Sequence, residues 1–168
     1  MQSEKAVQLI EKLNLSFHEE GGYFNETFRS EEIITTNRDV NNGERRLATC
    51  IYYMLTNTAP LGYFHSNMSP ILHFHHAGGP MIYRFIHGDG RIEEHVMGQD
   101  IANGEVLQLV APAGCWKSTQ LAPDHEYGLV SEVVFPGWEL FDSIIAKKQS
   151  LLDAFPQHAA WINAYSYN

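Results

Sequence analysis

Four histidines of this 168-residue chain lie in one short stretch, residues 63–79: His65, His73, His75 and His76. Successive side chains of a β-strand point to opposite faces, so His73 and His75 would share a face with Ile71. Imidazoles beside an aliphatic residue predict a polar site inside a β-structure. Because histidine transfers protons near neutral pH and also binds metal ions, the stretch predicts one of these two kinds of site.

Short strands are the elements that must position these histidines. Segments rich in β-branched and aromatic residues are predicted as strands at 47–55, 61–67, 71–76, 81–86, 91–96, 106–110, 116–121 and 128–135. Gly and Pro separate them at regular intervals, which is typical of a β-sandwich or barrel. The chain is therefore expected to form one all-β domain over residues 1–168.

The remaining segments are predicted to be helices and loops. A short N-terminal helix is expected at residues 3–14, capped by Ser3. A C-terminal helix, or a pair of helices interrupted at Pro156, is expected at 151–165. Residues 31–46 are polar and contain a turn signal, so they are predicted to form an exposed loop.

Charge and composition limit the partners. The formal net charge is −9 and the basic residues are scattered, which argues against nucleic acid. No apolar run is long enough to cross a membrane, and the acidic N-terminal segment does not resemble a signal peptide. Cys50 and Cys115 are expected to be buried free thiols, and a cytoplasmic location follows.

Several short motifs, taken together and in order, carry a resemblance to a known family. They are Glu20-Gly21-Gly22-Tyr23-Phe24, Phe64-His65, His76-Ala77-Gly78, Gly98-x-Asp100, Gly104-Glu105 with Gln108, Pro112-x-Gly114 and Pro136-Gly137-Trp138. Over roughly residues 10–158 the chain resembles the cupin superfamily, and within it a subfamily of short single-domain cupins of unassigned function. The resemblance implies a double-stranded β-helix, the jelly-roll barrel.

The usual metal ligands of that superfamily are mostly absent from this chain. Its first motif has two histidines, a glutamate and a glycine at positions that here hold His65, Asn67, Ile71 and Gly78. The ligand position of its second motif, a histidine, here holds Lys117. Relatives in the subfamily usually keep the glutamate and have aromatic residues at positions 73 and 75. The chain therefore departs from both patterns at the middle of the expected site.

A rebuilt metal site is one hypothesis that this departure allows. His65, His73 and His75 could form a substitute three-histidine site, and three imidazoles with water suit zinc, iron or copper. His73 and His75 would stand roughly 6.5–7 Å apart at the backbone, so both must tilt inward to share one ion. The preferred interpretation is a site without a metal or other cofactor.

Metal-free cupins imply the preferred enzymatic hypothesis. A cupin-type sugar-nucleotide epimerase removes a proton next to a carbonyl with a histidine base and a tyrosine acid. By this resemblance His65 is the candidate base and Tyr53 the first candidate acid, with Tyr63 and Tyr23 as alternatives. Lys117 could bind an anionic group or lower a neighbouring pKa. The function expected is isomerase or epimerase chemistry on a polar, carbohydrate-like substrate.

A third hypothesis is a non-catalytic protein that binds a small molecule in the barrel. Aromatic residues suit such a pocket, and Gln108 is a candidate because it interrupts an apolar strand. The remaining binding candidates are Glu20, Tyr23, Phe24, Asn67, His73, His75, Trp116 and Lys117. His18 and the other isolated histidines are expected to lie on the surface. The protein is expected to be a homodimer, with the segment Tyr23–Phe28 at the interface.

Overall fold

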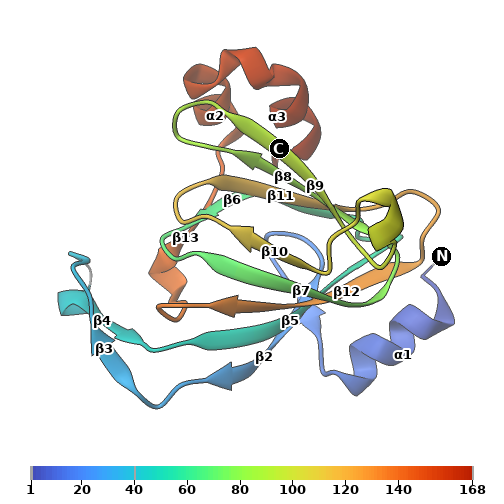
Figure 1. Cartoon of the computed structure of the whole chain (residues 1–168), viewed down its shortest axis with the longest axis horizontal. Helices are drawn as coiled ribbons and strands as arrows, with labels where there is room; N and C mark the ends of the chain where they lie inside the picture. Colours follow the sequence, from blue (N-terminus) through green and yellow to red (C-terminus); the bar gives the residue numbers. More distant parts are fainter. Residues whose placement is uncertain (1, 40, 168) are drawn as a thin grey trace.

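The protein is described by a computed structural model that covers residues 2–39 and 41–167, and two β-sheets dominate it (Figure 1). The larger sheet has the strand order β1-β2-β5-β12-β7-β10. Its strands are β1 (Ser16–Phe17), β2 (Tyr23–Arg29), β5 (Thr49–Thr56), β12 (Tyr127–Val134), β7 (Ile71–Gly78) and β10 (Gln108–Ala111). The predicted strands near residues 47–55, 71–76, 106–110 and 128–135 are thus confirmed.

The second sheet has the order β13-β6-β11-β8-β9. Its strands are β13 (Ser143–Ile145), β6 (Leu61–Asn67), β11 (Trp116–Leu121), β8 (Met81–Ile86) and β9 (Ile92–Met97). Neighbouring strands in both sheets run antiparallel. The predicted jelly-roll barrel is confirmed, with the main apolar core between the sheets.

Strands β5 and β12 are apolar on both faces because both faces are covered. Tyr53 and Leu55 of β5 join the core between the sheets, while Met54 packs outward against helix α1 (Glu4–Lys12). Helix α1 begins after Ser3, whose hydroxyl accepts a hydrogen bond from the backbone N–H of Ala6. The predicted N-terminal helix and its cap are confirmed.

The C-terminal helices cover the outer face of the second sheet. They are α2 (Lys148–Ala154), the 3₁₀ turn η4 (Pro156–His158) and α3 (Ala159–Tyr165), drawn in red above β8 in Figure 1. Their apolar residues Leu151 and Ile162 pack against Phe64 of β6 and Ile86 of β8. Phe64 points outward here, so its neighbour His65 points into the barrel.

Residues 31–46 were predicted as an exposed loop, and this prediction is wrong. They form a small sheet of β3 (Ile33–Thr35) and β4 (Glu44–Arg46), with the 3₁₀ turn η1 (Asn41–Gly43) before β4. Arg45 is 1% exposed and its guanidinium lies 3.1 Å from the carboxylate of Asp142. A buried ion pair therefore anchors this polar segment, which its sequence pattern did not indicate.

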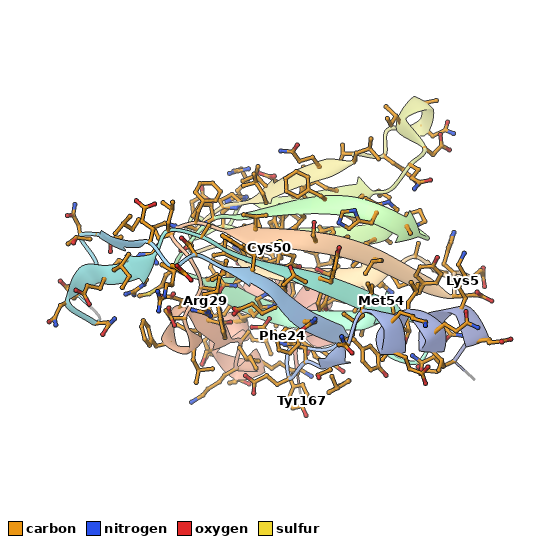
Figure 2. All side chains as sticks on the ribbon, turned by 90° about the horizontal axis from the view of Figure 1, so that it is seen from below. Lys5, Phe24, Arg29, Cys50, Met54 and Tyr167 are labelled. Atoms are coloured by element: carbon orange, nitrogen blue, oxygen red, sulfur yellow. The ribbon has the colours of Figure 1, made fainter. Side chains whose placement is uncertain are left out.

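Strand β2 lies second in its own chain's larger sheet, between the two-residue edge strand β1 and β5. It pairs with β5 along most of its length and with β1 at Tyr23 and Phe24. Figure 2 shows Phe24 and Arg29 along this strand, with Lys5 of α1 at the far end of the molecule from Arg29. The homodimer stays a prediction.

Among the described residues, no helix is long and apolar enough to span a membrane.

Candidate functional site

His65 of β6 lies inside the barrel with one ring nitrogen fixed and the other available. Its side chain is buried, and Nδ1 lies 2.8 Å from the carbonyl oxygen of Tyr63. Because a carbonyl only accepts hydrogen bonds, Nδ1 must carry the hydrogen and Nε2 is the acceptor in the neutral ring. Burial lowers the pKa of His65, and this effect prevails over the opposing influence of Glu20. The ring is therefore neutral at neutral pH.

Glu20 reaches His65 from the loop between β1 and β2. A side chain at Gly21 would collide with the carbonyl oxygen of Leu61, and its φ of 101° favours glycine, so the loop can lie close against β6. The backbone carbonyl of Glu20 accepts a hydrogen bond from the N–H of Tyr63 at 2.7 Å. This places Oε2 of Glu20 3.4 Å from Nε2 of His65. We call Glu20 and His65 the open pair.

The carboxylate of Glu20 is held in its ionised form. Burial opposes ionisation, but the hydrogen bond from the hydroxyl of Ser143 and the positive charge of Lys117 outweigh it and lower the pKa of Glu20. Ser143 donates a short hydrogen bond to Oε1. The open pair thus combines a neutral imidazole acceptor with a carboxylate anion.

A second group of polar side chains lies deeper in the barrel and is closed on itself. Glu132 and His73 are cross-strand partners in the larger sheet, whereas Lys117, the partner of His65 in the second sheet, reaches them across the barrel interior. The ammonium of Lys117 lies 3.1 Å from Nε2 of His73 and 3.5 Å from Oε2 of Glu132. We call Lys117, His73 and Glu132 the closed cluster.

The protonation states of the closed cluster follow from its burial and charges. Burial lowers the pKa of His73 to about 3, so its ring is neutral and Nε2 accepts a hydrogen bond from Lys117. Burial opposes ionisation of Glu132, but the ammonium of Lys117 outweighs it and lowers the pKa of Glu132. The cluster is therefore a buried ion pair with a neutral histidine beside the ammonium.

A central cavity of about 60 Å³ opens between the two sheets beside the open pair. Its lining residues are His18, Glu20, Phe24, Glu26, Thr49, Ile51, His65, Asn67, Ile71, Glu132, Val134 and Trp138. A single water requires about 10–15 Å³, so the cavity has room for a few waters or a small polar group. It adjoins an outer depression that shares His18, Glu20, Phe24 and Trp138. A ligand could therefore place a small group inside and a larger one at the mouth.

A family profile described as "Cupin superfamily (DUF985)" matches residues 7–146. The chain belongs to the cupin superfamily. An uncharacterized protein of Saccharomyces cerevisiae is 38% identical to this cupin over 155 residues, which cover 86% of this chain and 77% of the yeast protein.

Solved structures agree with this assignment. A hypothetical protein from Leishmania major has a TM-score of 0.90 and 29% identity, with 97% of this cupin and 99% of that chain covered. An oxalate decarboxylase from Bacillus subtilis has a TM-score of 0.53 and 16% identity, over 89% of this cupin and 36% of that chain. The second likeness shows the fold alone.

The residues at the superfamily's usual ligand positions do not fit a metal ion. Of the four, Ile71 has no donor atom, and Lys117 carries an ammonium whose nitrogen has no lone pair. That ammonium already supplies a positive charge between His73 and Glu132. A metal ion at this place would be repelled by the ammonium of Lys117.

The substitute three-histidine set does not converge either. Nε2 of His75 lies 3.2 Å from the carbonyl oxygen of Gly79, and Nε2 of His73 is occupied by Lys117. Over residues 2–39 and 41–167, no three His, Cys, Asp or Glu side chains are placed to hold one ion. The strand places His73 and His75 on the inner face as predicted, but the two rings have different partners.

Of the other predicted site residues, the structure brings three to the central cavity: Glu20, Phe24 and Asn67. Tyr53 is not among its lining residues. Its hydroxyl donates to the carbonyl oxygen of Gly21 at 3.0 Å, and burial raises its pKa well above the usual value. Its role as an acid is therefore not supported by its position.

Three binding candidates lie outside the barrel interior. Gln108 is exposed, because it pairs with the outward-facing Phe74 while Leu109 and Ala111 point inward. Trp116 packs against the C-terminal helices, and Tyr23 packs in the cluster under α1. The prediction that Gln108 faces the barrel was wrong by one residue of strand register.

Sequence reasoning missed several residues of the site, among them His18, Glu26, Thr49 and Glu132. Glu132 lies in a strongly β-forming segment and was not predicted as a site residue. It is two residues from both Val130 and Val134 and therefore shares their inward face. A carboxylate at an inward position of an apolar strand was the available signal. His18 was expected on the surface, but its side chain is only 16% exposed and lines the cavity.

Proposed function

We propose that this cupin carries out metal-independent acid–base chemistry, of the isomerase or epimerase type, on a small polar carbonyl compound of carbohydrate-like character. The observation that carries the proposal is Nε2 of His65. The hydrogen bond of Nδ1 with Tyr63 makes Nε2 the acceptor, and the ring lines the central cavity. Burial lowers the pKa of His65 and keeps the ring unprotonated, as a general base requires.

The proposed step is proton removal from a carbon next to the carbonyl. Nε2 of His65 takes the proton, and the electrons of the C–H bond form a C=C bond while the carbonyl π electrons move to oxygen. The resulting imidazolium lies beside Oε2 of Glu20, whose charge stabilises it. Loss of this proton to solvent and delivery of another proton to the opposite face of the carbon give an epimer. Return of the proton to the neighbouring carbon, with proton transfer between the oxygens, gives an isomer.

The oxygen that gains charge in this step needs a hydrogen-bond donor. Thr49 lines the cavity, and its Oγ1 accepts a hydrogen bond from the backbone N–H of Trp138 at 3.0 Å. Its own hydroxyl proton can then point toward the cavity. Thr49 therefore replaces Tyr53 as the neutral donor in the proposed step.

Deuterium exchange tests the proposal without knowledge of the product. Enolisation in D₂O replaces the hydrogen next to the carbonyl, which NMR detects in dihydroxyacetone, glyceraldehyde and glucosamine as probes. The variant His65→Asn retains an amide near Tyr63 but lacks Nε2. We expect its exchange rate on the accepted probe to fall by about 10²–10⁴-fold, the usual contribution of a general base.

A matched control is His125→Asn. His125 also places Nδ1 against a carbonyl oxygen two residues earlier, that of Pro123 at 2.9 Å, but it is exposed and outside the cavity. Its exchange rate should equal that of the unmodified protein. Equal rates in His65→Asn would refute the base assignment.

Two other outcomes would favour the alternative functions. Binding of a probe without any exchange above the buffer rate would favour a non-catalytic small-molecule-binding protein. An exchange rate that rises in proportion to bound zinc, iron or copper, measured by elemental analysis of protein purified without an affinity tag, would favour a metal-dependent enzyme. Retained activity with less than about a tenth of a metal ion per chain would support the proposed function.

A further inference from the structure

The charged groups that line the central cavity are carboxylates. They are Glu20, Glu26 and Glu132, and the lining contains no Lys or Arg. Two of the three have a cation outside the cavity: Arg29 lies 2.8 Å from Glu26, and Lys117 lies 3.5 Å from Glu132. Over the described ranges, Glu20 forms no ion pair with a Lys or Arg. One negative charge of the cavity is therefore left without a counter-charge in contact with it.

The histidines beside Glu20 do not supply that counter-charge. His18 accepts a hydrogen bond at Nδ1 from the backbone N–H of Glu20, at 3.0 Å, so this nitrogen carries no proton. His65 presents an unprotonated Nε2, because its proton is on the nitrogen that faces Tyr63. Both rings therefore offer lone pairs, rather than N–H groups, toward the carboxylate.

Asn67 gives an independent indication of what the cavity lacks. It lines the cavity, and its side-chain oxygen Oδ1 is buried with no hydrogen-bond partner among the described residues. A buried acceptor without a partner is unfavourable unless a ligand or water donates to it. Glu20 Oε2, His65 Nε2 and Asn67 Oδ1 are all acceptors. A ligand that satisfies them must carry several donor hydrogens.

The walls of the cavity suit a cation as well. Phe24 and Trp138 line both the cavity and the outer depression, and aromatic ring faces attract cations. A protonated primary amine offers three donor hydrogens and one positive charge in a volume that such a cavity can hold. A carboxylate or phosphate would instead meet the charge of Glu20 and three acceptors.

We infer that the central cavity takes a small ligand that carries a protonated amine, with the ammonium bound by Glu20, Asn67 and the aromatic wall. This inference rests on the proposed function for the identity of the site and extends it to the substrate class, an amino-carbonyl compound such as an amino sugar. The amine binds Glu20, and the carbon that loses a proton lies toward Nε2 of His65.

Three probes of similar size and different charge test the inference directly. At pH 7 ethanolamine is a cation, ethylene glycol is neutral and glycolate is an anion. Their binding can be followed by NMR titration of the indole N–H of Trp138. Because such small ligands make few contacts, weak binding in the millimolar range is expected. Ethanolamine should bind about tenfold more tightly than ethylene glycol, and glycolate most weakly.

Variants at Glu20 locate the source of the preference. Glu20→Gln keeps the shape but removes the charge, and should abolish the tenfold advantage of ethanolamine over ethylene glycol. Glu20→Asp keeps the charge and should retain most of it. Glu11→Gln, on the exposed face of α1, changes the net charge equally and should have no effect. Thermal unfolding of each variant confirms that it is folded before binding is compared.

Each result that differs from these expectations contradicts either the inferred ligand class or the proposed function. Tighter binding of glycolate, equal binding of all three probes, or binding of none would overturn the inferred ligand class. An ethanolamine preference that survives in Glu20→Gln would also overturn it. Deuterium exchange in non-amine probes would leave the acid–base proposal intact in those cases. A clear amine preference with no exchange in any probe would contradict the proposed function and leave the ligand class standing.

Discussion

The barrel contains two polar groups that differ in how their charges are arranged. In the closed cluster, the ammonium of Lys117 lies within 3.5 Å of Glu132 and donates to His73. In the open pair, the carboxylate of Glu20 faces a neutral imidazole rather than a cation. Both groups are built from a glutamate and a histidine, and both lie beside the same cavity. Only the first contains its own counter-charge.

This difference separates a structural role from a chemical one. Ionised groups in a protein interior require opposite charges and hydrogen bonds, and the closed cluster provides an ion pair between Lys117 and Glu132 and a hydrogen bond from Lys117 to His73. Its members can therefore support the strands that surround them. In the open pair, the carboxylate of Glu20 and the acceptor Nε2 of His65 lack a donor hydrogen between them until a proton or a ligand supplies one. We therefore expect the closed cluster to contribute to stability and the open pair to carry the proposed function.

Removal of one charge from the closed cluster should have the largest effect on stability. Lys117→Met leaves Glu132 buried without its cation, and the expected loss is about 3–5 kcal/mol in the free energy of unfolding. Glu132→Gln should cost a similar amount. The double variant should lose much less than the sum of the two, because no uncompensated charge remains. Urea denaturation measures all three values.

The same double variant also tests whether the closed cluster takes part in the chemical step. If the closed cluster is structural, the double variant should retain deuterium exchange within about threefold of the unmodified protein wherever it is folded. Additive losses of stability in the cycle would mean that the ion pair contributes little. A loss of exchange as large as that of His65→Asn would place the closed cluster in the chemical step.

A smaller effect is expected from the titration of His73. Its pKa of about 3 in the folded protein lies below the ordinary value of 6.5, because burial disfavours the charged ring. Below pH 6.5 the unfolded chain therefore binds a proton that the folded chain does not, and stability falls as pH falls. Between about pH 7 and pH 5 this amounts to about 2 kcal/mol.

His73→Gln tests this contribution, because an amide oxygen can still accept from Lys117 but does not titrate. Over about pH 7 to 5, above the usual range of carboxylates, the variant should lose about 2 kcal/mol less stability than the unmodified protein. From about pH 7 to 8.5, where His73 is neutral in both states, the two stability curves should run parallel. Parallel curves over the acidic range as well would show that His73 is not held neutral by the fold.

The fold could be predicted from sequence because its signals are redundant. Turn residues, alternating strands and a series of short motifs in order all indicate one barrel, so an error in one segment, such as 31–46, does not change the architecture. The open pair could be predicted in part: His65 occupies a motif position and Glu20 adjoins a pair of glycines. Their closeness follows from the approach of the Gly21 loop to β6, which no sequence pattern specifies.

The rest of the site depended on strand register and on hydrogen bonds that only the structure supplies. Gln108 interrupts an apolar strand, but its partner Phe74 faces outward, so Gln108 does too. Glu132 lies at an inward-facing position, which the alternation of side-chain direction along its strand could have revealed. Tyr53 also points inward, yet its hydroxyl is used by a backbone carbonyl. The inward direction of a side chain is thus predictable, whereas its partner is not.

Tyr53→Phe gives the smallest of the expected effects and decides whether this tyrosine takes part in the chemistry. Its hydroxyl donates to Gly21 in the loop that carries Glu20, so its loss leaves one buried carbonyl without this donor and should cost about 1 kcal/mol of stability. A slightly looser loop should weaken probe binding, while exchange at saturating probe stays within about threefold of the unmodified protein. A catalytic acid would give the opposite pattern, with intact binding and an exchange rate at saturation reduced about a hundredfold or more. The split between binding and rate therefore tells whether this buried hydroxyl belongs to the open pair or only supports the loop that carries it.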